Sequence, residues 1–264
     1  MDYTRYKALN FTHHDRVLTV SIDSGAPLNA VTHDLHLELS RVFVDVQNDD
    51  ECDLIVLTGE GPGFCAGGDM GWFQEMIDDQ SKFRDIAPDA KRIVFSLLDL
   101  EKPLICRLNG PAAGLGASIA LLSDVIIASD EAIIGDPHVK MGLVAGDGGA
   151  VIWPQLIGFA RAKELLMTGE MISATQAAEW GMINYAVPRD KLDAKVEEIV
   201  EKIRRNPRWA VRWTKTAINL TLKQIANQVM DPAIAYEIAT NAMDDHQEAV
   251  SAFAEKRRPN FTGK

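Results

Sequence analysis

The sequence has only three cysteines, a shortage of basic residues and no apolar segment that approaches a membrane span. Cys52, Cys65 and Cys106 are an odd number and lack the spacing of a metal site, which argues against a disulfide framework and favours a reducing compartment. The first residues, MDYTRYKALNF, have neither the apolar core of a signal peptide nor the Arg- and Ser-rich composition of a transit peptide. We therefore expect a cytoplasmic protein without a targeting segment.

The deficit of positive charge limits the classes of partner. The chain has 27 basic and 38 acidic residues and a net charge of -11, which argues against nucleic acid and anionic membrane surfaces as partners. One basic cluster, KRR at 256–258, can still bind a small phosphorylated ligand. With 264 residues, 47% of them hydrophobic, the chain can bury a large core, either as one domain or as a domain with an appendage.

Short apolar segments alternate with longer amphipathic segments, which predicts an α/β fold. β-Branched residues predict strands at 17–22, 54–58, 104–108, 125–128 and 132–134. Apolar periodicity predicts helices at 32–46 and 91–100, and an acidic loop at 76–90 is expected to shape a pocket. After Val187 only helical patterns follow. We expect a core of repeated ββα units at 1–195 and a helical region at 196–264 that packs on the core or on a neighbouring subunit.

Two glycine-rich motifs stand about forty residues apart. The first, FCAGGD at 64–69, is expected to leave the amides of Gly67 and Gly68 unpaired at a strand exit. The second, NGPAAGLGASIALLSD at 109–124, runs into an apolar helix that starts near Leu115 with unpaired N–H groups. Each motif alone is equally consistent with an ordinary turn. Together, the two sets of amides predict a site for one oxyanion, such as a thioester oxygen that gains negative charge.

Five motifs occur in an order that resembles the crotonase (enoyl-CoA hydratase/isomerase) superfamily, from about residue 10 onward. They are FCAGGDM, NGPAAGLGA, DPHVKMGLVAGDGGAV, ATQAAEWGMINYAVP and AFAEKRRPNF. The resemblance implies a crotonase-like spiral of ββα units and an acyl-CoA substrate. It implies coenzyme A as part of that substrate, with no separate cofactor and no metal. It also implies a homotrimer or a dimer of trimers, with contacts from the C-terminal helical region.

The resemblance further implies which residues bind the substrate. The oxyanion amides would be those of Gly68 and Leu115, and the carbonyl of Ala66 would face the adenine of coenzyme A. The residues implied to contact the rest of the coenzyme or substrate are Ala26, Leu28, Asp69, Phe253 and Lys256. Three of these have local alternatives: Asp69 as the cap of the next helix, Phe253 as a buried helix anchor and Lys256 as a solvated charge.

The sequence departs from the superfamily at its acid–base residues. Typical enoyl-CoA hydratases use two glutamates, and the corresponding positions are Ser118 and His138. A serine near the start of a helix can simply cap it or bond back to a carbonyl. His138 oriented by Asp147 would form a proton-transfer or water-activating pair, because an imidazole titrates near neutral pH. The alternatives are a packed loop histidine and an aspartate that caps the following helix.

His138, Asp147 and Glu237 together are similar to the β-diketone hydrolase branch of the superfamily, typified by oxocamphor hydrolase. There a His/Asp pair activates water and a glutamate from the tail joins the site. A second histidine of that branch would fall at Leu115 and is absent. The alternative to a site role is that Glu237 is a surface carboxylate on the polar face of a helix. Three functions stay open: an enoyl-CoA hydratase/isomerase, a β-diketone or acyl-CoA hydrolase with the same pair, and a non-catalytic acyl-CoA-binding protein.

Overall fold

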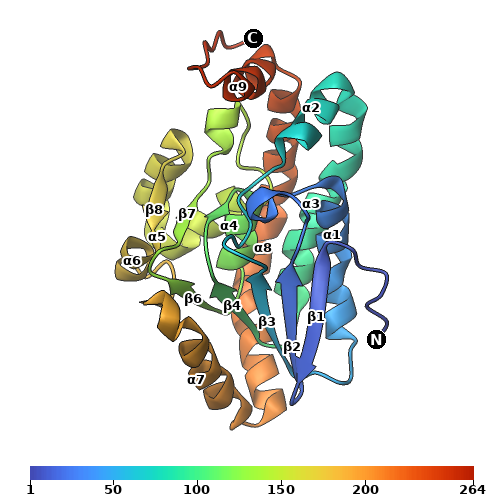
Figure 1. Cartoon of the computed structure of the whole chain (residues 1–264), viewed down its shortest axis with the longest axis vertical. Coiled ribbons are helices and arrows are strands. Elements are labelled where there is room, and N and C mark those ends of the chain that lie inside the picture. Colours follow the sequence, from blue (N-terminus) through green and yellow to red (C-terminus); the bar gives the residue numbers. More distant parts are fainter.

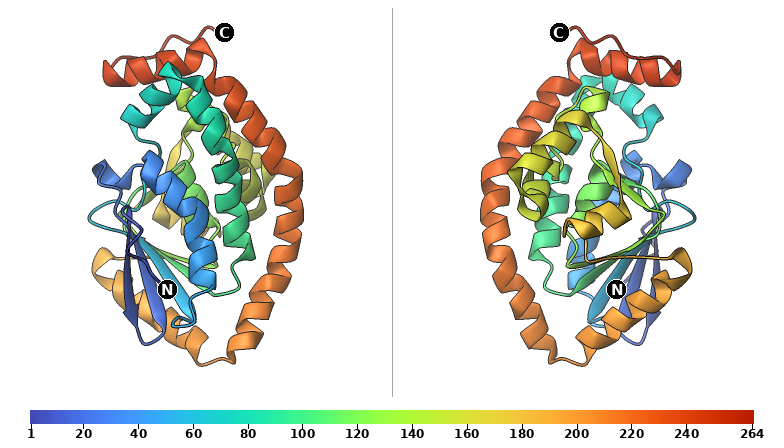
Figure 2. Two further views of the ribbon diagram at one scale, coloured as in Figure 1. Left: turned by 90° about the vertical axis from the view of Figure 1, so that its right-hand side faces the viewer. Right: turned by 90° about the vertical axis from the view of Figure 1, so that its left-hand side faces the viewer.

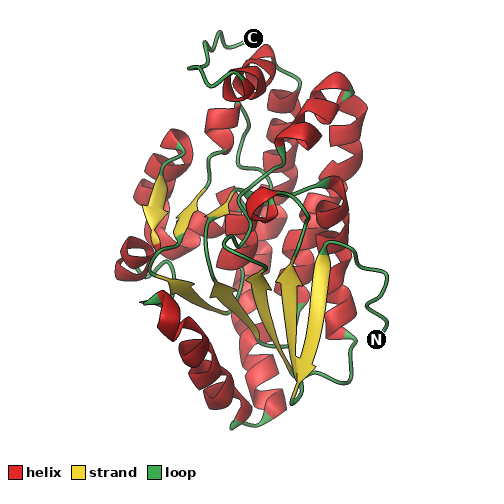
Figure 3. Cartoon of the chain, in the orientation of Figure 1, coloured by secondary structure: helices red, strands yellow, loops and turns green.

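Two β-sheets and the helices around them form the fold of the computed structural model, which describes residues 1–264 (Figures 1 and 3). The strands are β1 (Leu9–His14), β2 (Val17–Ile22), β3 (Leu54–Gly59), β4 (Leu104–Leu108), β5 (Ala112–Ala113), β6 (Val125–Ser129), β7 (Ile133–Gly135), β8 (Met171–Ser173) and β9 (Tyr185–Val187). The α-helices are α1 (His33–Gln47), α2 (Met70–Asp78), α3 (Gln80–Asp99), α4 (Leu115–Leu121), α5 (Gly149–Thr168), α6 (Ala174–Glu179), α7 (Leu192–Arg204), α8 (Arg208–Asn241) and α9 (Asp244–Ala254). The mixed α/β fold expected from the sequence is confirmed.

The larger sheet has the order β1-β2-β3-β4-β6-β9, and the smaller sheet has the order β5-β7-β8. β1 pairs with β2 antiparallel, and every later pairing in the larger sheet is parallel. The five predicted strands are confirmed as β2, β3, β4, β6 and β7, whereas the prediction missed β1, β5, β8 and β9. The carboxyl ends of β3 and β4 therefore lie side by side, and the two glycine-rich motifs follow them.

Helices cover both faces of the larger sheet. α7 packs its apolar residues against Leu54, Val56, Ile105 and Ile127 on one face. α1, whose amino terminus is capped by the Thr32 hydroxyl, packs against α3 on the other side of the molecule.

The structure corrects the prediction of a loop at 76–90. The acidic loop expected at 76–90 is the end of α2 and the first half of α3, because apolar residues recur at helical spacing along α3 in spite of a proline inside it.

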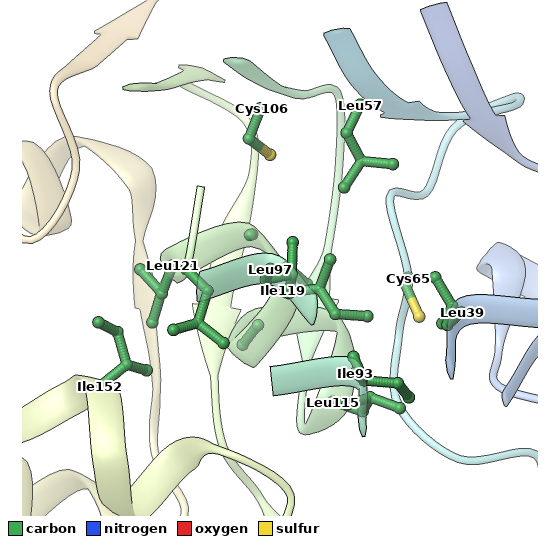
Figure 4. Close-up of a cluster of buried hydrophobic side chains, with 14 of the residues drawn as sticks. Leu39, Leu57, Cys65, Ile93, Leu97, Cys106, Leu115, Ile119, Leu121 and Ile152 are labelled. Carbon is green, nitrogen blue, oxygen red and sulfur yellow. The ribbon is translucent and has the colours of Figure 1, made fainter. Parts of the chain in front are cut away.

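α4 lies in the middle of the core, and every one of its residues is buried. Figure 4 shows Leu115 and Ile119 of α4 among side chains from α3 and the sheet, including Ile93 and Leu97. A Cβ at Gly116 would meet the carbonyl oxygen of Cys65, so only glycine allows α4 to approach the FCAGGD segment this closely. This contact fixes the two predicted amide segments relative to each other.

The chain after β9 is helical, as predicted. α8 runs along one side of the whole molecule and contacts α3 and α5, and α9 crosses the end of the molecule near α2 (Figure 2). α8 continues through Pro232 without a break. No helix has both the length and the apolar character that crossing a membrane requires.

Candidate active site

One cavity of about 570 Å³, including the space at its mouth, lies between α1, α2, α3, α8 and the start of α4. All five residues predicted for catalysis and the oxyanion site line it: Gly68, Leu115, His138, Asp147 and Glu237. The remaining lining residues are mostly apolar or aromatic: Val31, His36, Trp72, Phe73, Met76, Phe83, Ile86, Ala87, Ala90, Gly114 and Ile234. The structure thus brings residues from distant parts of the chain to one cavity.

The two predicted amide donors are carried by segments that hydrogen-bond to each other. Cys65 N–H donates to the Pro111 carbonyl at 3.1 Å, and Ala113 N–H donates to the Cys65 carbonyl at 2.9 Å. Gly68 pairs with Val31 in a bridge that uses the Gly67 carbonyl and the Asp69 N–H, so its own N–H stays outside that pairing.

Leu115 is the first residue of α4, where an N–H group has no intrahelical partner. Leu115 itself is helical, and the positive φ of 52° that favours glycine falls on the preceding Gly114. A Cβ at Gly114 would stand 3.1 Å from the imidazole carbon Cε1 of His138. The start of α4 therefore lies directly against the histidine ring.

His138 is held between carboxylates on both of its ring nitrogens. It opens a 3₁₀ turn, His138–Met141, and its Nδ1 lies 2.5 Å from Oδ1 of Asp136. The same oxygen accepts the backbone N–H of His138 at 3.3 Å. On the other side of the ring, Nε2 lies 3.3 Å from Oδ2 of Asp147 and 3.8 Å from Oε1 of Glu237. The side chain is 11% exposed, so the ring is fixed and still open to the cavity.

Asp147 does not cap a helix. α5 begins after Gly148 without any side-chain cap, and Oδ1 of Asp147 instead accepts the Ser118 hydroxyl at 3.4 Å. The interpretation of Ser118 as a locally satisfied hydroxyl is therefore wrong as well. The carboxylate of Asp147 lies between the Ser118 hydroxyl and the His138 ring, and most of it is buried.

Glu237 is not on the polar face of α8, because it is 6% exposed and its carboxyl faces His138. Two glycines of the GDGG motif make room for carboxylates of the cluster. A Cβ at Gly146 would meet the Glu237 carboxyl, and a Cβ at Gly149 would meet Oδ2 of Asp136. The glycine pattern of 146–149 is thus explained by close packing around acidic side chains.

The pKa values of His138 and Glu237 are both raised. Burial lowers the pKa of His138, but the charges of Asp136 and Asp147 outweigh it and raise that pKa well above 6.5. Burial raises the pKa of Glu237 to about 8, although the charge of His138 opposes this shift. At neutral pH the free site therefore contains an imidazolium and a neutral Glu237.

Asp136, His138 and Asp147 offer ligand atoms within 4.8 Å of one another, but the contacts of both ring nitrogens favour proton transfer over metal binding.

Glu237→Gln is expected to remove part of the pH dependence of stability between about pH 5 and pH 8. In wild type the folded protein keeps a proton at Glu237 that the unfolded chain releases above pH 4.5, so rising pH favours unfolding until the folded pKa of about 8 is passed. Between these pH values the Tm of wild type should fall by roughly 6 °C more than the Tm of the variant. Equal decreases in calorimetry would show that Glu237 is not held protonated.

The residues predicted to bind coenzyme A lie outside this cavity. Leu28 is 42% exposed, and its carbonyl accepts the Ala66 N–H at 3.2 Å, so the segments of Ala26 and Ala66 are adjacent. Phe253 is 61% exposed, which excludes the buried-anchor interpretation, and Lys256 is exposed at the end of α9. Asp69 caps α2 by accepting the Trp72 N–H at 3.0 Å, as its local alternative predicted.

Two site residues were missed by the sequence analysis. Asp136 had a local signal, since aspartate two residues before a backbone donor forms an Asx turn, here to His138 N–H. His36 lines the cavity from α1 and had no signal, because a histidine next to the apolar Leu35 and Leu39 resembles any other helical residue.

Comparison with known proteins gives a consistent result. Residues 12–264 match the enoyl-CoA hydratase/isomerase family. The chain is 34% identical to 1,2-epoxyphenylacetyl-CoA isomerase of Escherichia coli strain K12 over 94% of its length and 95% of that protein. Its structure is similar to that of an enoyl-CoA hydratase/isomerase from Mycobacterium paratuberculosis, with a TM-score of 0.90, 32% identity and coverage of 94% and 99%. It is also similar to ABDH, a β-diketone hydrolase from Anabaena sp. PCC 7120 bound to (S)-3-oxocyclohexyl acetic acid, with a TM-score of 0.84, 29% identity and coverage of 91% and 96%.

Proposed function

Because the chain belongs to the enoyl-CoA hydratase/isomerase family, we propose that this enzyme adds water to, or moves a proton within, the acyl group of a CoA thioester. The observation that carries the proposal is the single cavity lined by Gly68, Leu115, His138, Asp147 and Glu237. It offers hydrogen-bond donors for a carbonyl oxygen beside groups that exchange protons. Both are needed when the α-carbon of a thioester gains or loses a proton.

In this proposal the amides of Gly68 and Leu115 donate to the thioester oxygen. Negative charge develops on that oxygen when a nucleophile adds to the β-carbon or when a proton leaves the α- or γ-carbon. Donors that are already fixed in position stabilise the charge without reorganisation, and one such donor contributes on the order of 3 kcal/mol. The hydrogen bonds between 65 and 111–113 support this role, because they hold both amide segments in place.

His138 and Asp147 take the place of the two glutamates of typical relatives. The raised pKa of His138 makes its imidazolium the acid that protonates the α-carbon, and the Asp147 carboxylate accepts the proton of the attacking water. Asp136 keeps the ring in position through Nδ1, and Ser118 does the same for Asp147. For an isomerisation the same pair would move one proton between carbons, with no water.

The coenzyme would lie outside the cavity, across the surface formed by Ala26, Leu28, Ala66 and Asp69, with Phe253 and Lys256 near the nucleotide. The exposure of Leu28 and Phe253 supports this, since large apolar side chains open to solvent are available for contact with a ligand.

The region 196–264 is proposed to form the contacts of a homotrimer or a dimer of trimers. Exposed apolar side chains along α8, among them Trp213, Ile218 and Tyr236, support this proposal, and sedimentation equilibrium measures the mass that decides it.

A second candidate is a β-diketone or acyl-CoA hydrolase. The similarity to ABDH favours it, together with the His/Asp pair, which could equally activate water for attack on a carbonyl carbon. In that reaction the Gly68 and Leu115 amides would bind the oxygen of a tetrahedral intermediate.

Mass spectrometry of products separates the two candidates. The protein is incubated with a panel of enoyl-CoA esters, other acyl-CoA esters and cyclic β-diketones. Gain of one water, or a shifted double bond, with coenzyme A still attached is the expected result. Release of free coenzyme A or opening of a diketone ring would identify a hydrolase and contradict the first proposal.

A further inference from the structure

His36 is a buried polar side chain that lines the cavity and has no partner in the protein. It is the fourth residue of α1 and is 5% exposed. Its Nδ1 is enclosed without a hydrogen bond, and no neighbouring group forms a hydrogen bond that shifts the pKa of the ring. A buried polar atom without a partner is costly, and such atoms are rare in folded proteins. Because the side chain also lines the cavity, a molecule that enters the cavity can supply the partner that the protein does not.

The cavity wall around His36 carries few other polar groups: the proton-transfer cluster and the indole N–H of Trp72. Apart from His138, Asp147 and Glu237, the remaining lining residues are glycines and apolar or aromatic residues. The ring of Trp72 lies 5.4 Å from the ring of His36, inclined by 51°. An acyl group in this cavity thus meets apolar walls, an acid–base cluster and, separately, one imidazole.

The charge state of His36 defines what it can recognise. Burial lowers its pKa to about 4, and the charges of Asp89 and Asp147 offset this only in part. At neutral pH the ring is uncharged, with one nitrogen that donates and one that accepts a hydrogen bond. This matches a neutral oxygen, a ketone or a hydroxyl, whereas the uncharged His36 ring would give a carboxylate no cationic partner.

We propose that His36 determines substrate specificity by hydrogen-bonding a ketone or hydroxyl oxygen on the acyl group. The substrate class is then a CoA thioester whose apolar acyl part carries one neutral oxygen function in addition to the reacting centre. This inference rests on the proposed function, because it requires that the cavity holds the acyl group of a thioester. A site with an unpaired polar group discriminates strongly against analogues that lack the matching oxygen.

The test compares the affinities of saturated thioesters that cannot be hydrated. Calorimetric titration gives dissociation constants for two matched pairs: hexanoyl-CoA with 5-oxohexanoyl-CoA, and cyclohexylacetyl-CoA with 3-oxocyclohexylacetyl-CoA. In at least one pair the oxo compound should bind wild type about 10-fold more tightly than its parent. His36→Phe should abolish this preference, and His36→Gln, which can still donate and accept, should retain part of it. His33→Phe on the same helix is the control, since His33 is exposed and outside the cavity.

The possible results separate this inference from the function on which it rests. Binding of all thioesters without any preference for the oxo compounds would overturn the role of His36 and leave the proposed function intact. A preference that survives in His36→Phe would overturn it too. If no thioester binds, not even hexanoyl-CoA, the proposed function fails and the inference fails with it.

Discussion

Replacing His138 by alanine is expected to lower the kcat of the proposed reaction by about 100-fold to 10000-fold, the range for loss of a general acid or base. The imidazole lies against Asp136, Asp147 and Glu237 at once and is the group that the proposal assigns as the acid. The affinity for a saturated acyl-CoA should change by less than about threefold, because in the proposed complex backbone amides bind the thioester oxygen. Steady-state kinetics and calorimetric titration measure the two effects.

The control for this experiment is His14→Ala, which removes an imidazole whose side chain is 88% exposed. It should keep the full rate. His138→Gln adds a second comparison, because glutamine fills similar space between the carboxylates but cannot transfer a proton. An unaltered kcat in either His138 variant would remove His138 from the mechanism. A loss of affinity that parallels the loss of rate would instead indicate that the ring shapes the binding site.

The sequence motifs predicted which residues would meet in the cavity, but not how they contact one another. His138 and Asp147 were expected to form an isolated pair with the aspartate as the orienting group. In the structure Asp136 contacts Nδ1 at 2.5 Å, more closely than Asp147 contacts Nε2. The second carboxylate changes the chemistry, because it raises the pKa of His138, whereas an imidazole that titrates near neutral pH was expected from the sequence. Such shifts depend on distances between loops and cannot be derived from spacing along the chain.

The fold was predictable where local pattern and tertiary environment agree. The apolar, β-branched sequences of β2, β3 and β4 are typical of strands that are buried in a parallel sheet, and their bounds were predicted within a residue. β5 could not be predicted, since two alanines carry no strand signal and are placed by pairing with β7. Conversely, α3 contains a proline and many charges, yet burial of Phe83, Ile93 and Leu97 stabilises it as a helix.

A proline at position 68 is expected to lower kcat by about 100-fold to 1000-fold relative to alanine at the same position. Proline lacks the N–H group that we assign to the thioester oxygen, and removal of one such donor typically costs on the order of 3 kcal/mol. The backbone loses no other hydrogen bond, because the bridge to Val31 uses the Gly67 carbonyl and the Asp69 N–H. The rate effect therefore reports on the amide itself, provided that the side-chain atoms added at position 68 are matched in the comparison.

That matching is needed because any Cβ at Gly68 would collide with the ring of Phe73. Both substitutions should therefore be made in a Phe73→Ala background, so that Gly68→Ala and Gly68→Pro both carry a Cβ that has room. The alanine form retains the amide and should keep most of the activity of Phe73→Ala, while the proline form loses it. Retention of the Phe73→Ala rate in both forms, with matching circular dichroism spectra, would place the oxyanion site elsewhere. A rate lost equally in both forms would show that Gly68 is needed for space rather than for its N–H, since the two variants differ mainly in that donor.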